Sequence, residues 1–515
     1  MSRLRQSKTV AVPAATGGWN VKDPISDMPV KDAIVLDNIF PEPSTIRLRN
    51  GYREHTPQIT DSPIETIHEH YGIASGARRL LAAINGDIYD CSTYGAAATN
   101  LTSGLGAFNN NRWSIVNFKG TGTTDTRSVW CNGADTPLLF DGAAFTASAY
   151  TVITDPTKLS NVISFKKQLF FLENDTGNNR TSIWYGAVNA FNGALTEFPV
   201  ASVLSKGGKF LAQASQGVNT GAGFQDNYIV MSDLGELLIY SGITPATDFA
   251  LIGRYFLPKP LGNRPFIKID SDLIILTVQG AIPLSKVVTT GDTSQTYQRL
   301  TDKIQLAYND VAAFYGDNFG WEGTVYPRGH YLTLNVPISG TETHQYVMNL
   351  LTGAWCRFKN QNGLCFNTFN DKLYFGTSDG KVMEADIGLN DNSSSIPWKI
   401  KQSFNYLNNP QKVKRVTLVK PQMIGSEGMT FNLGVDVDFA DRPLTASITT
   451  ATTSGTDWGA AWGSPWDSGA NNSYDDWYGV DGVGRAVALR MEGDFNGIAF
   501  QNTANYFIFE PGGVL

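Results

Sequence analysis

The residues His68, Glu69 and His70 have types and a spacing that could bind a metal ion. In an extended strand His68 and His70 point to the same face, so their imidazoles could hold zinc with His55 as a third ligand. The chain has only 5 histidines, and no fixed spacing places His55 beside the other two. The run from Ile67 to His70 also alternates like an ordinary half-buried strand. We therefore expect a structural strand here and no metal site.

Three aspartates could bind calcium, because Asp436, Asp438 and Asp441 carry the hard oxygen atoms that this ion prefers. Their positions lack the regular ligand spacing of an EF-hand loop. We expect them to lie on the solvated edge of a hairpin. The sequence also contains no GxxxxGKS or GxxxxGKT phosphate loop, no GxSxG elbow and no HExxH helix. We expect no cofactor.

The segment from Leu444 to Val483 is rich in Thr, Ser, Gly, Asp and aromatic residues. Its carboxylates Asp475 and Asp476 could act on a glycosidic bond while aromatic rings stack on sugars. Glycosidases, however, hold two carboxyl groups about 5 to 10 Å apart across a pocket, which adjacent loop residues do not fix. Trp and Tyr are also typical interface residues. We favour a subunit or partner interface formed by Trp458, Trp462, Trp466, Trp477 and Tyr478, and no catalytic residues.

Composition limits the functional classes. The chain has 515 residues, of which 42% are hydrophobic and only 17% charged, so it can bury a large core without disulfides. The net charge of −7 leaves no broad basic face for gripping nucleic acid. The 4 cysteines are scattered without a CxxC pair, and the start lacks the apolar core of a signal peptide. No window of 18 apolar residues indicates a membrane span.

A pattern of two β-rich runs around a Gly-containing turn recurs six or seven times between residues 60 and 390. The turns are mostly about 40 to 60 residues apart, close to the repeat length of propeller blades. The turns at Thr352 and Asp379 are closer together and could share one blade. Unrelated β-sandwich hairpins are the alternative. The hairpins are Leu80–Asp90, Ser128–Phe145, Val162–Gly186, Tyr228–Ile243, Leu273–Val287, Gln345–Phe358 and Lys372–Ala385.

The two ends of the chain predict further elements. Apolar spacing predicts a helix over Lys31–Phe40 that stops at Pro41, and Thr45–Arg49 alternates like a strand. A polar run at 388–395 is followed by strands at Val413–Val419, Met429–Phe439 and Ala486–Met491. We therefore expect an all-β chain with an N-terminal segment (1–59), a β-propeller (60–390) and a C-terminal β domain (391–515) containing the long loop 444–483. The two outer parts would form a β-sandwich-like platform.

Both ends also resemble a known family. The N-terminal part contains Gly17-Gly18-Trp19-Asn20-Val21-Lys22-Asp23-Pro24, Met28, the run from Asp32 to Pro41, and Leu48-Arg49-Asn50-Gly51-Tyr52. The C-terminal part reads Asn505-Tyr506-Phe507-Ile508-Phe509-Glu510-Pro511-Gly512-Gly513-Val514-Leu515. These segments, about 60 residues in total, resemble the tail hub or nozzle proteins of short-tailed bacteriophages, also called tail tubular protein B or packaged-DNA stabilisation protein.

The resemblance implies a structural protein of the virion tail, assembled in the host cytoplasm, and no enzyme. It implies a homohexameric ring below the portal and its head-to-tail adaptor, in contact with tail fibre, spike or needle proteins. Such a ring would retain packaged DNA and let double-stranded DNA pass without specific binding. We expect Trp19, Phe40, Arg47 and Arg49 to join the aromatic loop in subunit or partner contacts. The alternative is a propeller that binds or hydrolyses glycans.

Overall fold

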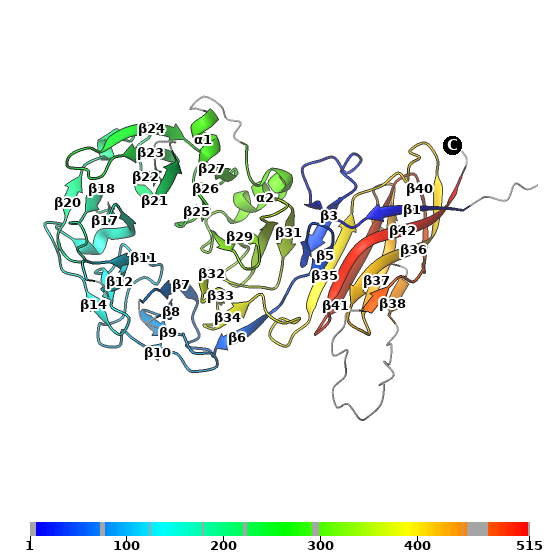
Figure 1. Ribbon diagram of the computed structural model, residues 1–515, viewed down its shortest axis with the longest axis horizontal. Coiled ribbons are helices and arrows are strands. Elements are labelled where there is room, and N and C mark those ends of the chain that lie inside the picture. Colours follow the sequence, from blue (N-terminus) through cyan, green and yellow to red (C-terminus); the bar gives the residue numbers. More distant parts are fainter. Residues whose placement is uncertain are drawn as a thin grey trace, which may run out of the picture.

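Short antiparallel sheets follow one another in a ring and form a β-propeller, beside which a two-sheet β-sandwich is placed (Figure 1). This arrangement comes from a computed structural model. The fold class expected from the sequence is therefore confirmed. The structure describes residues 7–72, 78–122, 125–177, 180–219, 224–290, 298–444, 446–450 and 472–512.

Within these residues the ring has six four-stranded blades and one three-stranded sheet. The first blade consists of β7 (Ile64–His70), β8 (Arg79–Ile84), β9 (Asp87–Asp90) and β10 (Thr99–Asn100). The second consists of β11 (Ser114–Lys119), β12 (Thr126–Cys131), β13 (Leu138–Phe140) and β14 (Phe145–Ala147). The third consists of β16 (Leu159–Phe165), β17 (Gln168–Asp175), β18 (Arg180–Tyr185) and β20 (Thr196–Phe198). Two short strands, β15 (Tyr150–Thr151) and β19 (Gly193–Ala194), pair in parallel next to the third blade.

The fourth blade consists of β21 (Phe210–Asn219), β22 (Phe224–Ser232), β23 (Glu236–Ser241) and β24 (Ala250–Phe256). The three-stranded sheet consists of β25 (Phe266–Ile269), β26 (Asp272–Thr277) and β27 (Gly280–Pro283). The sixth and seventh sheets are β28 (Glu322–Tyr326), β29 (Tyr331–Pro337), β30 (Thr343–Asn349) and β31 (Trp355–Phe358), then β32 (Cys365–Phe369), β33 (Lys372–Gly376), β34 (Val382–Ala385) and β6 (Tyr52–Thr56).

Each of the seven hairpins predicted from the sequence lies in a different sheet of this ring. Local chemistry explains the success: between β8 and β9, Asn85 and Gly86 have φ angles of 50° and 80°, which this residue pair adopts with little strain. The suggestion that the turns at Thr352 and Asp379 share a blade is wrong. They belong to neighbouring blades, because β30 pairs with β31 and β33 with β34.

The N-terminal segment closes the ring. Strand β6 pairs with β34 and forms the outer edge of the last blade, so the first and last parts of the propeller are held by backbone hydrogen bonds. The expected boundary at residue 59 therefore misplaces β6, which belongs to the propeller. Closure of this kind leaves no open side in the ring of blades.

The sandwich consists of the other strands from both chain ends. One sheet continues from β31 through β3 (Asp32–Asp37), β35 (Ile396–Gln402), β41 (Val487–Phe495), β37 (Thr430–Val437) and β38 (Ala446–Thr449), with β2 (Gly18–Trp19) beside β3. The other contains β1 (Lys8–Pro13), β4 (Ile39–Pro41), β5 (Ile46–Leu48), β36 (Lys414–Gly425), β39 (Asn472–Tyr474), β40 (Tyr478–Gly484) and β42 (Phe500–Pro511). Buried side chains such as Trp398, Met423 and Phe507 form part of the core between them.

The helix predicted over Lys31–Phe40 is wrong, because this stretch forms β3 and β4. Asn38, with φ at 57°, separates the two strands. The β-branched residues Ile34, Val35 and Ile39 favour strands, and pairing of β3 with β35 decides the outcome. The 444–483 region was expected to be one loop, yet its two ends form β38, β39 and β40.

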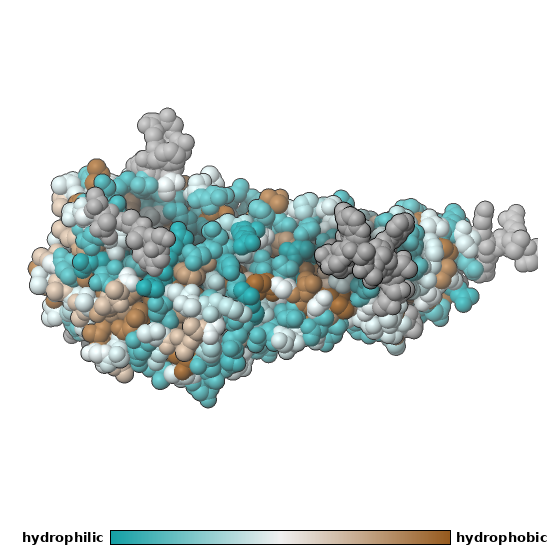
Figure 2. Space-filling view, turned by 60° about the horizontal axis from the view of Figure 1, so that its bottom comes forward, coloured by the Kyte–Doolittle hydropathy of each residue, from teal (hydrophilic) through white to brown (hydrophobic). Residues whose placement is uncertain are grey.

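Among the described residues, two α-helices lie between the fifth and sixth sheets: α1 (Leu284–Thr290) and α2 (Gln305–Tyr315). The same residues include 3-10 turns at Pro156–Lys158, Ala201–Val203 and Asp302–Ile304. In the part of the chain that the structure describes, no helix is long and apolar enough to cross a membrane. The face in Figure 2 is largely hydrophilic, with separate hydrophobic patches over the propeller and near its boundary with the sandwich.

Candidate functional site

The junction between the propeller and the sandwich contains the N-terminal residues that the sequence singled out. Strand β31 of the sixth blade pairs in parallel with β3 through Asp37 and Arg357, so one sheet runs from the propeller into the sandwich. Arg357 Nε lies 2.8 Å from Asp37 Oδ1, and Lys359 Nζ lies 2.9 Å from Oδ2. Burial disfavours the charged carboxylate, but Arg357 and Lys359 hold the pKa of Asp37 below its ordinary value.

A buried ion pair crosses the same junction. Arg49 Nη1 and Nη2 donate to the two carboxylate oxygens of Asp391 at 2.8 and 2.6 Å, and only 2% and 3% of these side chains are exposed. Arg49 also donates to Asn38 Oδ1 and to the carbonyl oxygen of Lys359. Burial raises the pKa of Asp391 despite Arg49. The pair therefore fixes geometry, and loss of one partner would leave a buried charge uncompensated.

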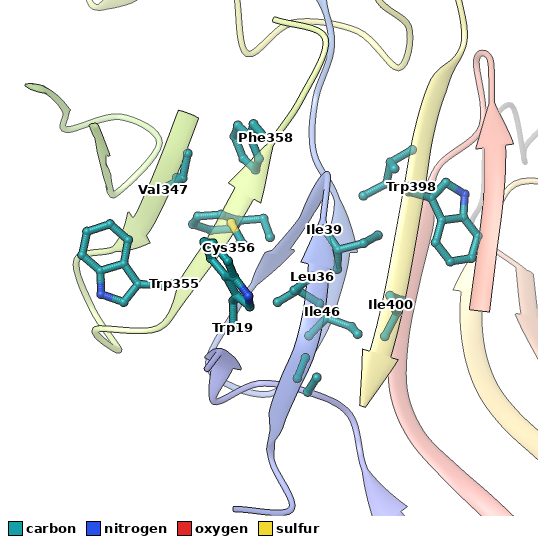
Figure 3. Close-up of a cluster of buried hydrophobic side chains, with 14 of the residues drawn as sticks. Trp19, Leu36, Ile39, Ile46, Val347, Trp355, Cys356, Phe358, Trp398 and Ile400 are labelled. Atoms are coloured by element: carbon teal, nitrogen blue, oxygen red, sulfur yellow. The ribbon is translucent and has the colours of Figure 1, made fainter. Parts of the chain in front are cut away.

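Aromatic packing completes the junction (Figure 3). Trp19 meets Tyr346 edge to face at a ring distance of 5.1 Å, and the Arg357 guanidinium lies 5.1 Å from the centre of the Trp19 ring. Figure 3 shows Trp19 between strands of the blade and those of the N-terminal segment. Phe40 is 4% exposed, packs edge to face on Tyr331, and has the Arg47 guanidinium 5.1 Å from its ring centre.

These positions correct the expected interface. Trp19, Phe40 and Arg49 are buried within the chain and join its two parts, so their side chains are not on a surface that a partner could contact. Arg47 is only 22% exposed and pairs with Glu42 at 2.8 Å. The residue types and positions singled these residues out in the sequence. The sequence did not show their distant intrachain partners, among them Tyr346, Tyr331 and Asp391.

A cleft of about 460 Å³ opens beside the junction. Several of its charges are paired: Lys372 Nζ lies 2.9 Å from Glu384 and Arg47 Nε lies 2.8 Å from Glu42. The neutral amide of Asn50 donates to Asp386 at 3.0 Å. Burial raises the pKa of Asp386. A cleft with mixed charges does not select a ligand of one sign. The charged residues that line it are Glu42, Arg47, Arg328, Lys372, Glu384 and Asp386.

A second ion pair spans the propeller ring. Arg264, which precedes β25, places Nη1 2.9 Å from Glu322 Oε2 of β28, and its Nη2 donates to Thr66 Oγ1 of β7 at 2.7 Å. Nη2 also lies 3.2 Å from the carbonyl oxygen of Trp113, just before β11, while the backbone N–H of Phe366 in β32 donates to Glu322. Burial raises the pKa of Glu322 although Arg264 opposes this.

These contacts join five successive sheets of the ring at one point. Inner strands of a propeller surround its central channel, and ligands of propellers commonly enter there. The Arg264–Glu322 pair and its partners therefore link the first strands of neighbouring sheets around the ring. No motif in the sequence indicated this contact.

The histidines suggested as metal ligands lie in β7, as expected for a strand. His68 Nε2 is 3.3 Å from Asn117 Oδ1, and His70 Nδ1 is 2.5 Å from Ser128 Oγ, so both link the first two blades. Burial lowers the pKa of both histidines to about 4. His55 is elsewhere, with Nε2 3.0 Å from the carbonyl oxygen of Cys91. Among the described residues no three His, Cys, Asp or Glu side chains gather in a metal-binding group.

The three aspartates differ from one another. Asp436 is 1% exposed and lies 3.0 Å from Lys401 Nζ, so its expected place on a solvated edge is wrong. Asp441, which is exposed, also pairs with Lys401. Exposed Asp438 accepts a hydrogen bond from the backbone N–H of Arg485. The carboxylates neutralise cations and hold a turn.

Of the aromatic loop residues, Trp477 and Tyr478 are described. Trp477 is 40% exposed, and Lys420 Nζ lies 5.4 Å from its ring centre. Tyr478 is half-buried at the start of β40. Asp475 lies 3.4 Å from Lys420. Trp458, Trp462 and Trp466 lie outside the described residues.

Comparisons with known proteins give no family. No family model and no curated protein matches the chain. Among solved structures, Saccharomyces cerevisiae Sqt1 covers 65% of this chain and 99% of its own, with 11% identity and a TM-score of 0.38. The extracellular domain of the putative hybrid two-component system BT3049 from B. thetaiotaomicron covers 83% of this chain and 51% of its own, with 9% identity and a TM-score of 0.41. The computationally designed Ika8 protein covers 65% and 100%, with 10% identity and a TM-score of 0.34.

Proposed function

We propose that this chain is a structural subunit of a short-tailed bacteriophage tail, the hub or nozzle that forms a ring below the portal and adaptor. The resemblance of the two chain ends to that family motivates the proposal. In the resulting assembly the ring retains packaged DNA and provides the passage for genome ejection. The protein acts by shape and assembly and carries out no reaction.

One observation supports this proposal most strongly: backbone pairing and a buried ion pair lie at the boundary between the propeller and the sandwich. The sheet that continues from β31 into β3 and the buried Arg49–Asp391 pair both connect the two parts. An enzyme that closes on a substrate would gain from a hinge at such a boundary. A ring subunit gains instead from a connection without a hinge, because a fixed angle between its two parts fixes the geometry of the ring.

In the proposed ring, DNA would pass between copies of the chain and not through a propeller. The net charge of −7 suits a passage along which phosphates slide without being gripped.

Electron microscopy of the purified chain mixed with a portal and adaptor complex tests the proposal. The expected result is a ring of this chain below the adaptor, with a central opening and propellers at its periphery. The chain alone and the portal–adaptor complex alone serve as controls. A chain that stays monomeric in the mixture and cleaves or binds a surface glycan would contradict the proposal and favour the glycan alternative.

A further inference from the structure

The cleft beside the junction contains one cation and one carboxyl group that its two ion pairs leave over. These are Arg328, in the turn between β28 and β29, and Asp386, directly after β34. In the part of the chain that the structure describes, neither side chain forms an ion pair. Asp386 accepts a hydrogen bond from the neutral amide of Asn50 at 3.0 Å. The cleft therefore presents one unpaired group of each sign.

The two groups face a shared space. Burial raises the pKa of Asp386, whereas the nearby guanidinium groups of Arg47 and Arg328 lower it. The phenol of Tyr326 lines the same cleft; burial raises its pKa, Asp386 raises it further, and Arg328 opposes this. Charges shift a pKa in this way mainly over short distances. Arg328, Asp386 and Tyr326 therefore converge on the cleft, without a direct ion pair between the first two.

A ligand that suits this cleft must carry both signs of charge. The cleft has a volume of about 460 Å³, within the range of about 300 to 1,000 Å³ that is typical of small-molecule sites. A simple anion would be attracted by Arg328 and repelled by Asp386, and a simple cation the reverse. An α-amino acid carries a carboxylate and an ammonium group on one carbon atom. Its carboxylate also matches the two parallel N–H donors of a guanidinium group.

We propose that this cleft binds a free α-amino acid, with the carboxylate on Arg328 and the ammonium group on Asp386. The hydroxyl of Tyr326 lies where it can donate to the carboxylate. Residues from the β4–β5 hairpin line the cleft together with residues of the propeller, so the bound amino acid contacts both parts of the chain. The site lies within one copy and does not depend on the proposed ring.

Ligand-observed NMR of the full chain with each standard amino acid in turn tests the class of ligand. At least one amino acid is expected to bind. Its N-acetyl derivative lacks the ammonium charge and its α-amide lacks the carboxylate, so each should bind about tenfold more weakly or worse. Failure of every amino acid to bind would overturn the inference. Equal binding of the amino acid and either derivative would overturn recognition by two charges.

Two variants test the position of the site. Arg328→Gln and Asp386→Asn should keep the fold, because Arg328 is exposed and asparagine tolerates the left-handed conformation of Asp386, with φ at 58°. Each should weaken binding of the amino acid about tenfold or more. Arg415→Gln, the same change at an exposed arginine of β36 outside the cleft, should bind like the wild type.

If Arg328→Gln and Asp386→Asn bind the amino acid as tightly as the wild type, the ligand lies elsewhere and the inference is wrong. Far-ultraviolet circular dichroism of each variant shows whether the fold is kept. Assembly with the portal and adaptor is measured separately, so the proposed function and this inference can each fail without the other.

Discussion

Arg264 Nη1 and Glu322 Oε2 lie 2.9 Å apart and connect the fifth and sixth sheets of the propeller. Arg264 lies in the connection before β25, whereas Glu322 begins β28. Their shared partners extend the contact to β7, to Trp113 before β11 and to β32. One ion pair thus stabilises the position of five sheets, and its removal is the most direct way to disturb the ring of blades.

Replacing Arg264 should destabilise the propeller. In Arg264→Ala the 9% exposed carboxylate of Glu322 loses its cation, and breaking a buried pair in this way costs about 3 kcal/mol. Urea unfolding followed by tryptophan fluorescence measures the loss. Arg328→Ala, a change at an exposed arginine, should shift the free energy of unfolding by less than about 0.5 kcal/mol. Equal unfolding curves for the two variants would show that the pair does not hold the ring together.

Because Arg49 and Asp391 form a buried ion pair, the effect of replacing one of them on stability should depend on whether the other is present. Arg49→Met should destabilise the junction by about 3 to 5 kcal/mol, because Asp391 is then buried without a cation. Adding Asp391→Leu should recover most of this loss, since the second charge is removed as well. Hydrogen exchange of β3 and β31 reports on the junction itself. If the double variant is no more stable than Arg49→Met, the lost ion pair is not the cause of the destabilisation.

The buried histidines predict acid sensitivity. The pKa of His70 is lowered to about 4 in the folded protein, against about 6.5 in an unfolded chain. The unfolded chain therefore binds more protons between these values, and stability present above about pH 6.5 falls as the pH drops towards 4. For the fully buried His70 the loss is about 3 kcal/mol.

Denaturant unfolding at several pH values between 4 and 7 measures this slope. A His70→Gln variant should show a shallower decline over that range, because one group that must be charged in acid has been removed. The charged groups that face His70 are Asp141 and Arg79, and both remain in this variant. The matched control is His330→Gln, the same change at an exposed histidine. Identical slopes for wild type and His70→Gln would contradict the prediction.

The cysteines should be unreactive in the folded chain. Cys91, Cys131, Cys356 and Cys365 are free and buried, and burial raises the pKa of each thiol. A thiolate is the reactive form, so a thiol reagent at pH 8 should modify none of the four until denaturant is added. Rapid modification of one cysteine under native conditions would place it on a surface and contradict its position in the core.

The sequence by itself determined the β-rich character and the seven hairpins, because a turn such as Asn85-Gly86 is set by the φ preferences of adjacent residues. It could not determine whether 31–40 forms a helix or strands, since pairing of β3 with β35 outweighs local spacing. Nor could it show that Arg49 meets Asp391, 342 residues away, or that Arg264 meets Glu322, 58 residues away. Only the tertiary structure decides such pairs, because burial and closure of the ring bring the charges together.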